Sequence, residues 1–410
     1  MQFRQTKLPN GLTIIAELNG DAYSSSIGFF VKTGSRNESV DLLGVSHFLE
    51  HLVFKGSASL SAIEVNCRLD DLGADANAFT EEEQTVFHIT VLPEFVGAAI
   101  DLLGDILRPA FRKRDFEMER QVILEEIRMY CEQPPFGADA IIRKIFFGGH
   151  PLANSVIGLE STVSNLSIDQ LRAYHAARYT PENIVVAGTG KIEFDYFCDC
   201  VKRACGKWES SGLSRNKGDQ RYRINGAAGF HKITKKSVSQ QYTMMLSNAP
   251  SGVDSDFFPA LILSDIIGDV VGSRFYWEFI DNGVADTAGM SIQEYSDNGF
   301  FDAVLASEPA AMKKIIENVK KIFADITKNG ITKGELERAK NKTLSRIIIG
   351  SEGSDGRLFT VGGDWVMTGK YRTLQQESEI IQNITIENVN TIIKKYPLNN
   401  PLILTIGPTK

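Results

Sequence analysis

The chain has 410 residues, of which 43% are hydrophobic and 23% are charged. These values are typical of a folded globular protein and argue against a disordered or fibrous chain. The 44 basic and 51 acidic residues leave a net charge of −7, which argues against nucleic acid or an anionic membrane as the main partner.

The length of 410 residues is enough for two or three domains. The first residues, MQFRQTKLPNGLTIIAEL, lack the charged start, apolar run and cleavage site of a signal peptide. No window approaches ~18 uninterrupted apolar residues, so no membrane-spanning helix is expected. The five cysteines show no disulfide spacing. A cytoplasmic protein is therefore expected.

The first elements are predicted to be strands. QFRQTKL and LTIIAEL flank Pro9, Asn10 and Gly11, and Asn-Gly between two alternating segments is a strong hairpin signal. SSSIGFFVKTG predicts a further strand.

Residues 44–56, GVSHFLEHLVFKG, predict a helix. Its apolar residues recur at helical spacing: Val45, Phe48, Leu49, Leu52 and Val53. A second stripe beside them contains His47, Glu50 and His51.

The rest of the first half alternates helices and a strand. Ser61 and Glu64 fit a capping box that opens a helix. QTVFHITVL alternates as a half-buried strand does, and the segments PEFVGAAIDLLGDIL and RKRDFEMERQVILEEIRMY predict two helices.

Residues 209–223, rich in glycine, serine and charge, are the best candidate for a linker. The order of elements beyond it repeats that of the first half. The prediction is an α+β protein of two homologous α/β domains, residues 1–212 and 213–410, each with a mainly antiparallel sheet packed against helices and related by duplication.

Two histidines four residues apart project from one face of a helix, so His47 and His51 can bind one cation together. A core helix with two satisfied histidines is the competing interpretation. Glu50 is rotated by about 100° around the helix from His51 and can reach a water at such an ion without being a ligand. The pattern is H-x-x-E-H, and a catalytic zinc needs a third protein ligand.

The helix RKRDFEMERQVILEEIRMY offers that ligand. Glu119 and Glu126 lie two turns apart on its apolar stripe, whereas Glu125 lies on its polar stripe. A carboxylate on a buried face is costly unless it is paired or binds a metal. Glu126 is therefore the candidate ligand, and Glu125 is a surface charge.

These segments resemble the inverted-motif zinc peptidases, the family of pitrilysin, insulin-degrading enzyme and mitochondrial processing peptidase. HFLEH at 47–51 and ERQVILEE at 119–126 carry the resemblance, and GADANAFTEEEQT and GGHPLANSVIG agree with it. In that family the third ligand follows the second histidine by about 75 residues, which is the separation of His51 and Glu126.

The resemblance implies one Zn²⁺ per chain, bound by His47, His51 and Glu126, with Glu50 as the base that activates water. It also implies that Glu119 supports the site without being a ligand. NAFT at 77–80 looks like the edge strand that holds an extended peptide, so Asn77, Ala78 and Phe79 are predicted to bind substrate by strand addition.

The second half lacks these residues. In our alignment of FEMERQVILEEI with LERAKNKTLSRI, Glu119 falls on Ala339 and Glu126 falls on Arg346. One active zinc site per chain is therefore expected.

The second half also departs from the family at two positions that help to hold substrate. Where many relatives have an arginine and a tyrosine, this chain has Ile280 and Asp286, and Arg274 and Tyr276 lie nearby but out of register. Because the family's closed form uses four such domains, a dimer is implied, with a homodimer favoured and a heterodimer that supplies the missing pair left open.

The sequence thus predicts a zinc-dependent endopeptidase acting on peptides or unfolded segments. A heterodimer's catalytic subunit and a non-catalytic assembly or binding subunit, as some relatives are, remain alternatives. A purely structural zinc is disfavoured, because three ligands leave an open position and Glu50 would lack a purpose.

Overall fold

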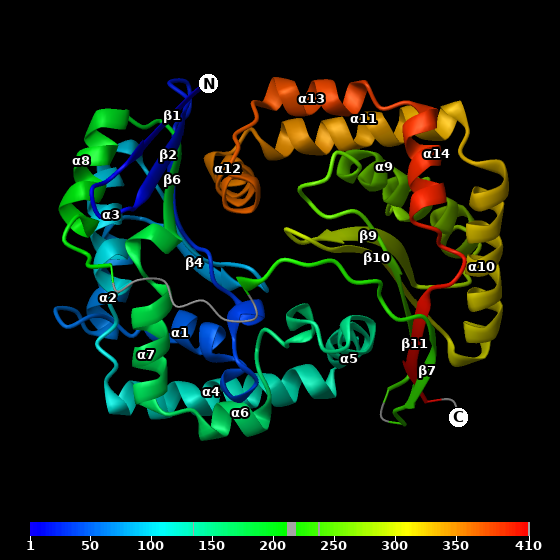
Figure 1. Cartoon of the computed structure of the whole chain (residues 1–410), viewed down its shortest axis with the longest axis horizontal. Helices are drawn as coiled ribbons and strands as arrows, with labels where there is room; N and C mark the ends of the chain where they lie inside the picture. The colour runs from blue at the N-terminus through cyan, green and yellow to red at the C-terminus, as the bar shows by residue number, and fades with distance from the viewer. Residues whose placement is uncertain (134, 211–218, 237, 409–410) are drawn as a thin grey trace. The chain divides into compact units, whose positions relative to one another are not determined.

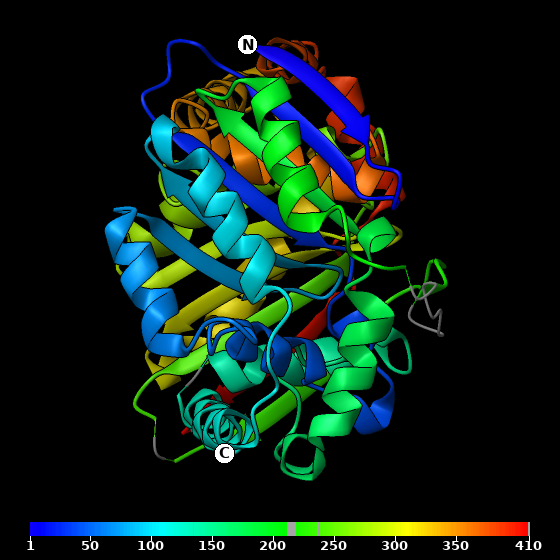
Figure 2. The same cartoon turned by 90° about the vertical axis from the view of Figure 1, so that its left-hand side faces the viewer.

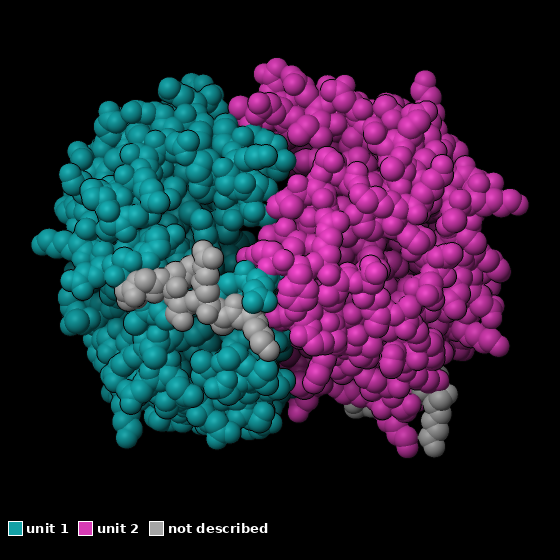
Figure 3. All heavy atoms as spheres, viewed as in Figure 1, with its two compact units in different colours: residues 1–128, 154–220, 349–372 teal, residues 129–153, 221–348, 373–410 magenta. Residues whose placement is uncertain are grey.

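The computed structural model describes residues 1–133, 135–210, 219–236 and 238–408. They form two compact units, coloured separately in Figure 3. Unit 1 comprises residues 1–128, 154–220 and 349–372, and unit 2 comprises residues 129–153, 221–348 and 373–410. Each unit is thus discontinuous in the sequence. The predicted boundary between residues 212 and 213 lies outside the described residues.

Unit 1 is built on a six-stranded sheet with the order β1-β2-β6-β3-β5-β4. The strands are β1 (Gln2–Lys7), β2 (Thr13–Leu18), β3 (Ser25–Val31), β4 (Asp75–Thr80), β5 (Thr85–Val91) and β6 (Ile184–Gly190). Only β2 and β6 pair in parallel. The predicted hairpin of β1 and β2 is confirmed, and Gly11 adopts a φ of 95° in its turn, a conformation that favours glycine.

Helices cover both faces of this sheet. They are α1 (Val45–Val53), α2 (Ala62–Asp71), α3 (Val96–Ile106), α6 (Glu160–Asn165), α7 (Ile168–Arg178), α8 (Phe194–Cys205) and α12 (Ser354–Thr368), with most of α4 (Lys113–Glu132). In Figure 1, α3 and α8 lie on the opposite side of the strands from α12, and in Figure 2 the cyan α3 and green α8 lie in front of them.

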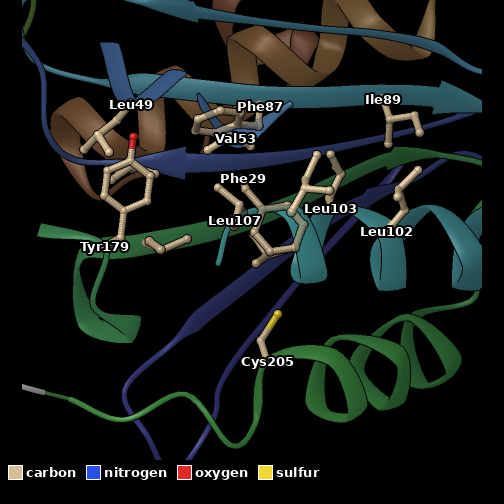
Figure 4. Packing of buried hydrophobic residues seen from close by; sticks show 14 of the residues in the cluster. Phe29, Leu49, Val53, Phe87, Ile89, Leu102, Leu103, Leu107, Tyr179 and Cys205 are labelled. Carbon is tan, nitrogen blue, oxygen red and sulfur yellow. The ribbon is translucent and has the colours of Figure 1, made fainter. Parts of the chain in front are cut away.

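Neighbouring residues of β3 point into two different apolar layers, as strand geometry requires. Phe29 belongs to the layer formed with α1, α3 and α8, and Phe30 belongs to the layer formed with α12. Figure 4 shows Phe29, Phe87 and Leu103 packed together in the first layer.

The helix α12 follows the rest of unit 1 by more than a hundred residues, yet it packs on this sheet. Leu358 and Val361 are buried against it. The Arg357 guanidinium donates hydrogen bonds of 2.8 and 2.7 Å to the two carboxylate oxygens of Glu17 on β2, and both side chains are 2% exposed. This bidentate pair fixes the position of α12 along the strands.

Unit 2 has a five-stranded sheet with the order β7-β11-β8-β10-β9. The strands are β7 (Gly229–Thr234), β8 (Gln241–Asn248), β9 (Thr287–Glu294), β10 (Gly299–Ser307) and β11 (Leu402–Gly407). The helices are α5 (Phe136–Phe147), α9 (Phe257–Gly268), α10 (Met312–Asn329), α13 (Leu374–Gln382) and α14 (Ile386–Lys395), with most of α11 (Lys333–Gly350). α5 packs on one face of this sheet, and α9, α10 and α14 form the core on the other.

The predicted α+β fold of two similar halves is confirmed. Each sheet is mainly antiparallel and has one parallel pair, β2 with β6 and β7 with β11, and in both pairs the second member is the last strand of its sheet in the sequence. The helices α10 and α11 of the second half are equivalent to α3 and α4 of the first half. The correspondence extends to α12 and α5, each of which follows a long helix and packs on the sheet of the other sequence half.

Candidate metal and catalytic site

The helix α1 carries the HFLEH residues and begins at Val45. Its N-cap, Gly44, provides no side-chain cap. Instead, the buried carboxylate of Glu38 accepts hydrogen bonds from the N–H groups of Gly44 (2.7 Å) and Ser46 (2.8 Å). The N–H groups at this end of a helix lack helical partners, and the two oxygens of Glu38 supply acceptors for them. The start of α1 is therefore fixed one residue before His47.

The helix α4 lies against α1 through aromatic packing. The rings of Phe48 and Phe116 are stacked with centroids 5.0 Å apart. Phe116 and Ile123 are buried, Glu119 is 3% exposed on the same side, and Glu126 is half-buried. The two glutamates thus project toward α1, as the predicted apolar stripe implied.

Three side chains from α1 and α4 meet. Nε2 of His47 and Nε2 of His51 each lie 3.7 Å from Oε2 of Glu126, and the three ligand atoms are all within 4.8 Å of one another. Zinc bonds of about 2.0–2.2 Å place tetrahedral ligand atoms roughly 3.4 Å apart. The three residues therefore fit one zinc ion, and within the described ranges no other histidine, cysteine or carboxylate group forms such a cluster.

Burial and neighbouring charges shift the pKa values of the three clustered side chains. Burial and the neighbouring His51 lower the pKa of His47 to about 3, so its ring is neutral and can bind a metal. Burial alone would lower the pKa of His51, but its hydrogen bond to Glu119 and the negative charge of Glu126 raise it overall. Burial raises the pKa of Glu126. His47 is therefore available as a neutral ligand, and the acidic neighbours of His51 favour a positive charge on its ring.

Glu119 lies behind His51 and orients its ring. Oε2 of Glu119 is 3.0 Å from Nδ1 of His51, and Oε1 is 2.7 Å from Nζ of Lys55. An N–H on Nδ1 leaves the lone pair of Nε2 directed to the side of Glu126. Sequence reasoning missed Lys55, whose position one turn after His51 was the available signal. By contrast, Nδ1 of His47 is buried and has no hydrogen-bond partner among the residues that the structure describes.

Glu50 is outside the three-residue cluster and is bound to the edge strand of the sheet. The hydroxyl of Thr80, the last residue of β4, donates a hydrogen bond of 2.6 Å to Oε2 of Glu50. This is the one hydrogen bond to Glu50 that the described part of the chain shows. Burial raises the pKa of Glu50, partly offset by Thr80. A carboxylate with a raised pKa beside a metal site suits a base that takes a proton from water.

The strand β4 lies at the edge of its sheet and pairs with β5 only. Asn77 lies opposite His88 and Phe79 opposite Val86. Asn77 is exposed, and Ala78 and Phe79 are half-buried. The predicted substrate-binding residues thus occupy a strand with one free edge beside Glu50.

Ile280 and Asp286 of the second half lie in different local structures. Ile280 ends a π-helical turn, Tyr276–Ile280, and Asp286 accepts a hydrogen bond from Gln240. Arg274 is engaged with Asp325 and Glu335.

Comparisons with known proteins agree on one family. Residues 13–160 match the model of insulinase, peptidase family M16, and residues 165–343 match that of the peptidase M16 inactive domain. An uncharacterised zinc protease of Mycobacterium leprae is 30% identical over 95% of this chain and 88% of its own length. The zinc protease YmxG of Bacillus subtilis is 27% identical over 98% and 97%. The β subunit of mitochondrial-processing peptidase from Saccharomyces cerevisiae is 26% identical over 94% and 87%.

Solved structures share the fold. A protease from Helicobacter pylori has a TM-score of 0.90 at 19% identity, covering 99% of both chains. A peptidase M16 inactive domain from Pseudomonas fluorescens has a TM-score of 0.92 at 18% identity, covering 100% of this chain and 98% of its own. A chain of complex III from Candida albicans has a TM-score of 0.85 at 16% identity, covering 99% and 96%. Among the described residues, no helix combines the length and apolar character needed to cross a membrane.

Proposed function

The chain belongs to peptidase family M16, and from this premise we propose that it is a zinc-dependent endopeptidase of peptides or unfolded segments. One observation carries the proposal. His47, His51 and Glu126 form a cluster that could hold a metal ion, while Glu50, one residue before His51, is outside that cluster and accepts a hydrogen bond from Thr80. Three protein ligands leave a position open for chemistry, which is characteristic of catalytic rather than structural zinc.

In this proposal Zn²⁺, when bound by His47, His51 and Glu126, supplies a Lewis acid that acidifies water and polarises the scissile carbonyl. Glu50 takes the proton from the attacking water through the carboxylate oxygen that does not accept from Thr80, and then passes that proton to the leaving amine. Glu119 holds the ring of His51 in place. The catalytic role falls to the predicted domain 1–212 and the related domain 213–410 is non-catalytic.

The substrate would bind as an added strand on the free edge of β4. Backbone groups of Asn77, Ala78 and Phe79 would pair with an extended peptide, which tolerates many sequences and leaves selectivity to side-chain contacts. Strand addition requires an extended segment that can lie along β4, and short peptides and unfolded chains provide one, so these are the proposed substrates. The assembly proposed for the chain is a dimer.

A catalytic subunit of a heterodimer is the second candidate. Apolar Ile280 and anionic Asp286 stand where many relatives have an arginine and a tyrosine, and Arg274 is committed to Asp325 and Glu335. A partner chain would then supply the groups that hold substrate. A relative named as a β subunit of a processing peptidase is consistent with this alternative.

The test compares the parent chain with Glu50→Gln, which retains the size of the side chain and removes the base. We expect about one zinc per chain in both proteins and a loss of cleavage of roughly 10²–10⁴-fold in the variant. Metal analysis and mass spectrometry of a mixed peptide library measure the two quantities. Glu125→Gln is the matched control, because Glu125 is exposed and paired with Arg128.

Equal cleavage by the parent and Glu50→Gln would remove Glu50 as the base. If the parent binds zinc but cleaves nothing, the library is repeated with a co-expressed M16 chain that has the arginine and tyrosine. Cleavage only in that mixture would favour the heterodimer.

A further inference from the structure

Glu119 connects two side chains of the α1 segment. It is 3% exposed, and each of its carboxylate oxygens has a different partner. Oε2 contacts Nδ1 of His51 at 3.0 Å, and Oε1 contacts Nζ of Lys55 at 2.7 Å. The contacts thus form a chain from Lys55 through Glu119 to His51, which ends where Nε2 of His51 faces Glu126 at 3.7 Å.

Lys55 provides charge that the buried carboxylate requires. Removing a carboxylate from water costs free energy unless a partner of opposite charge replaces the lost hydration. Of the side chains that the structure describes, Lys55 is the only lysine or arginine paired with Glu119. His51 cannot fill that role while its Nε2 binds a metal and its ring stays neutral.

The segment that carries Lys55 is itself held in place. Lys55 follows the end of α1, and Gly56 after it adopts a φ of 95°. Arg112, which directly precedes α4, donates hydrogen bonds to the carbonyl oxygens of Lys55 (3.1 Å) and Leu60 (3.1 Å). Because Glu119 lies on α4, the backbone that carries each partner of the ion pair is tied to the other.

The local charge balance also points to Lys55. A divalent cation bound here would be surrounded by three carboxylates, Glu50, Glu119 and Glu126. The ammonium group of Lys55 balances the third negative charge. Lys55 pairs with Glu119, the carboxylate that contacts Nδ1 of His51.

We propose, building on the proposed function, that Lys55 is a positioning residue that sets the metal affinity of the site through Glu119 and His51. Lys55 holds Glu119 in the rotamer that accepts the Nδ1–H of His51, and this keeps the Nε2 lone pair directed at the metal position. The direction of the effect is diagnostic. A lysine that merely repelled a nearby cation would weaken metal binding, so its removal would tighten the complex, whereas loss of a positioning lysine weakens it.

The experiment measures zinc affinity by competition with a fluorescent chelator, and the visible spectrum of the Co²⁺-loaded protein. Lys55→Met retains the aliphatic stem and removes the charge, and Lys55→Arg retains the charge. We expect a Kd about 10-fold higher for the methionine variant, recovery to within about 3-fold of the parent in the arginine variant, and a changed Co²⁺ spectrum only in the former. Lys395→Met, which removes an exposed lysine paired with Asp256, should match the parent.

A second pair of variants separates positioning from loss of fold. In a Glu119→Gln background, Lys55→Met should change the Kd less than about 2-fold, because the carboxylate through which it acts is gone. Thermal unfolding of the metal-free proteins verifies that each variant folds, and Lys55→Gln replaces the methionine variant if that one does not. An unchanged or lower Kd on loss of the charge overturns the inference, as does a full loss in the Glu119→Gln background.

Because this assay contains no peptide, its outcome is separate from that of the cleavage test. Zinc binding without cleavage, both by the chain alone and with the co-expressed M16 chain, contradicts the proposed peptidase and leaves the Lys55 comparison measurable. A parent chain that binds no zinc overturns both proposals.

Discussion

The helix pair α1 and α4 of the first half and the pair α9 and α11 of the second half have the same place in the duplicated fold but opposite charge arrangements. Asp265 and Asp269, at the end of α9, are four residues apart, as are His47 and His51. Arg346 of α11 lies 3.2 Å from Asp269 and also pairs with Asp265.

Arg346 is the residue that aligns with Glu126 in our comparison of the two halves. In the second half, the guanidinium of Arg346 and the ammonium of Lys342, 3.0 Å from Asp269, balance the two aspartates. In the first half, a carboxylate stands at this position opposite two histidines, and the described structure provides no side-chain cation there. The proposed zinc would supply the cation of the first site, whereas the second carries its cations on the chain. The two sites differ in the sign of the charge at one position of equivalent helix pairs.

The largest effect is expected from exchanging these charges. Glu126→Arg removes a ligand and places a cation beside His47 and His51, so we expect loss of zinc and at least a 10³-fold loss of cleavage, on the order of 4 kcal/mol of transition-state stabilisation. Metal analysis and peptide cleavage measure the outcome. A Glu126→Arg protein that retains a full zinc complement would contradict the assigned ligand set.

Arg346→Glu is the matched exchange in the second half. It should leave one zinc per chain and near-parental cleavage, because the ion pair it breaks is structural. It should lower the free energy of unfolding by roughly 1–3 kcal/mol, because a third carboxylate joins Asp265 and Asp269 with only Lys342 to balance them. Denaturant unfolding of the metal-free protein measures this loss. Loss of cleavage without loss of stability in Arg346→Glu would contradict this comparison of the two halves.

Local patterns in the sequence predicted the duplicated fold and the candidate site residues, because each of these predictions rests on a short stretch of sequence. The spacing of His47 and His51 depends only on helix geometry. The apolar stripe of the second helix was enough to separate Glu126 from the exposed Glu125. Neither step required knowledge of which surfaces meet.

What the sequence did not predict depends on contacts between distant segments. Periodicity shows that α12 has an apolar face, but not that this face covers the sheet of unit 1, where Arg357 pairs with Glu17. Likewise, the sequence pattern places Lys55 after a helix and Thr80 in a strand but does not indicate the side chains that they contact. Their roles emerge only when Glu119 and Glu50 are placed beside them in space.

Two threonines offer a finer comparison of the halves. The Thr80 hydroxyl donates to Glu50 and the Thr343 hydroxyl donates to Asp265, each at 2.6 Å. Thr80→Val should lower kcat by roughly 10-fold or more with little change in KM or zinc content, because a hydrogen bond to a carboxylate is worth about 1.5–3 kcal/mol. Thr343→Val should leave kcat unchanged and lower the free energy of unfolding by about 1 kcal/mol.

Steady-state kinetics and denaturant unfolding separate the two threonine variants. Thr80→Ser retains the hydroxyl and should recover most of the lost kcat. Similar kcat values for Thr80→Val and the parent would mean that the Thr80 hydroxyl does not orient Glu50, and a drop in kcat for Thr343→Val would erase the distinction between the halves.

The smallest expected effect concerns how the second half responds to pH. Burial raises the pKa of Asp265 above its usual value of 3.8, and the hydrogen bond from Thr343 and the charge of Arg346 lower it in part. A folded pKa above the unfolded one means that folding favours the protonated acid. The stability that Asp265 contributes is therefore fully present below about pH 4 and is lost as the pH rises through the folded pKa.

Arg346→Leu removes the charge that limits this loss, so the folded pKa of Asp265 should rise further and stability should fall more as the carboxylate ionises. The difference in unfolding free energy between the parent and Arg346→Leu should thus be small near pH 4 and grow to about 1 kcal/mol at pH 7. Denaturant unfolding of the metal-free proteins at both pH values measures it without a contribution from zinc release. Arg346→Lys, which retains the charge, should show a nearly constant difference, and a pH-independent deficit in Arg346→Leu would indicate that Arg346 stabilises α11 by packing rather than as the cation of the second half.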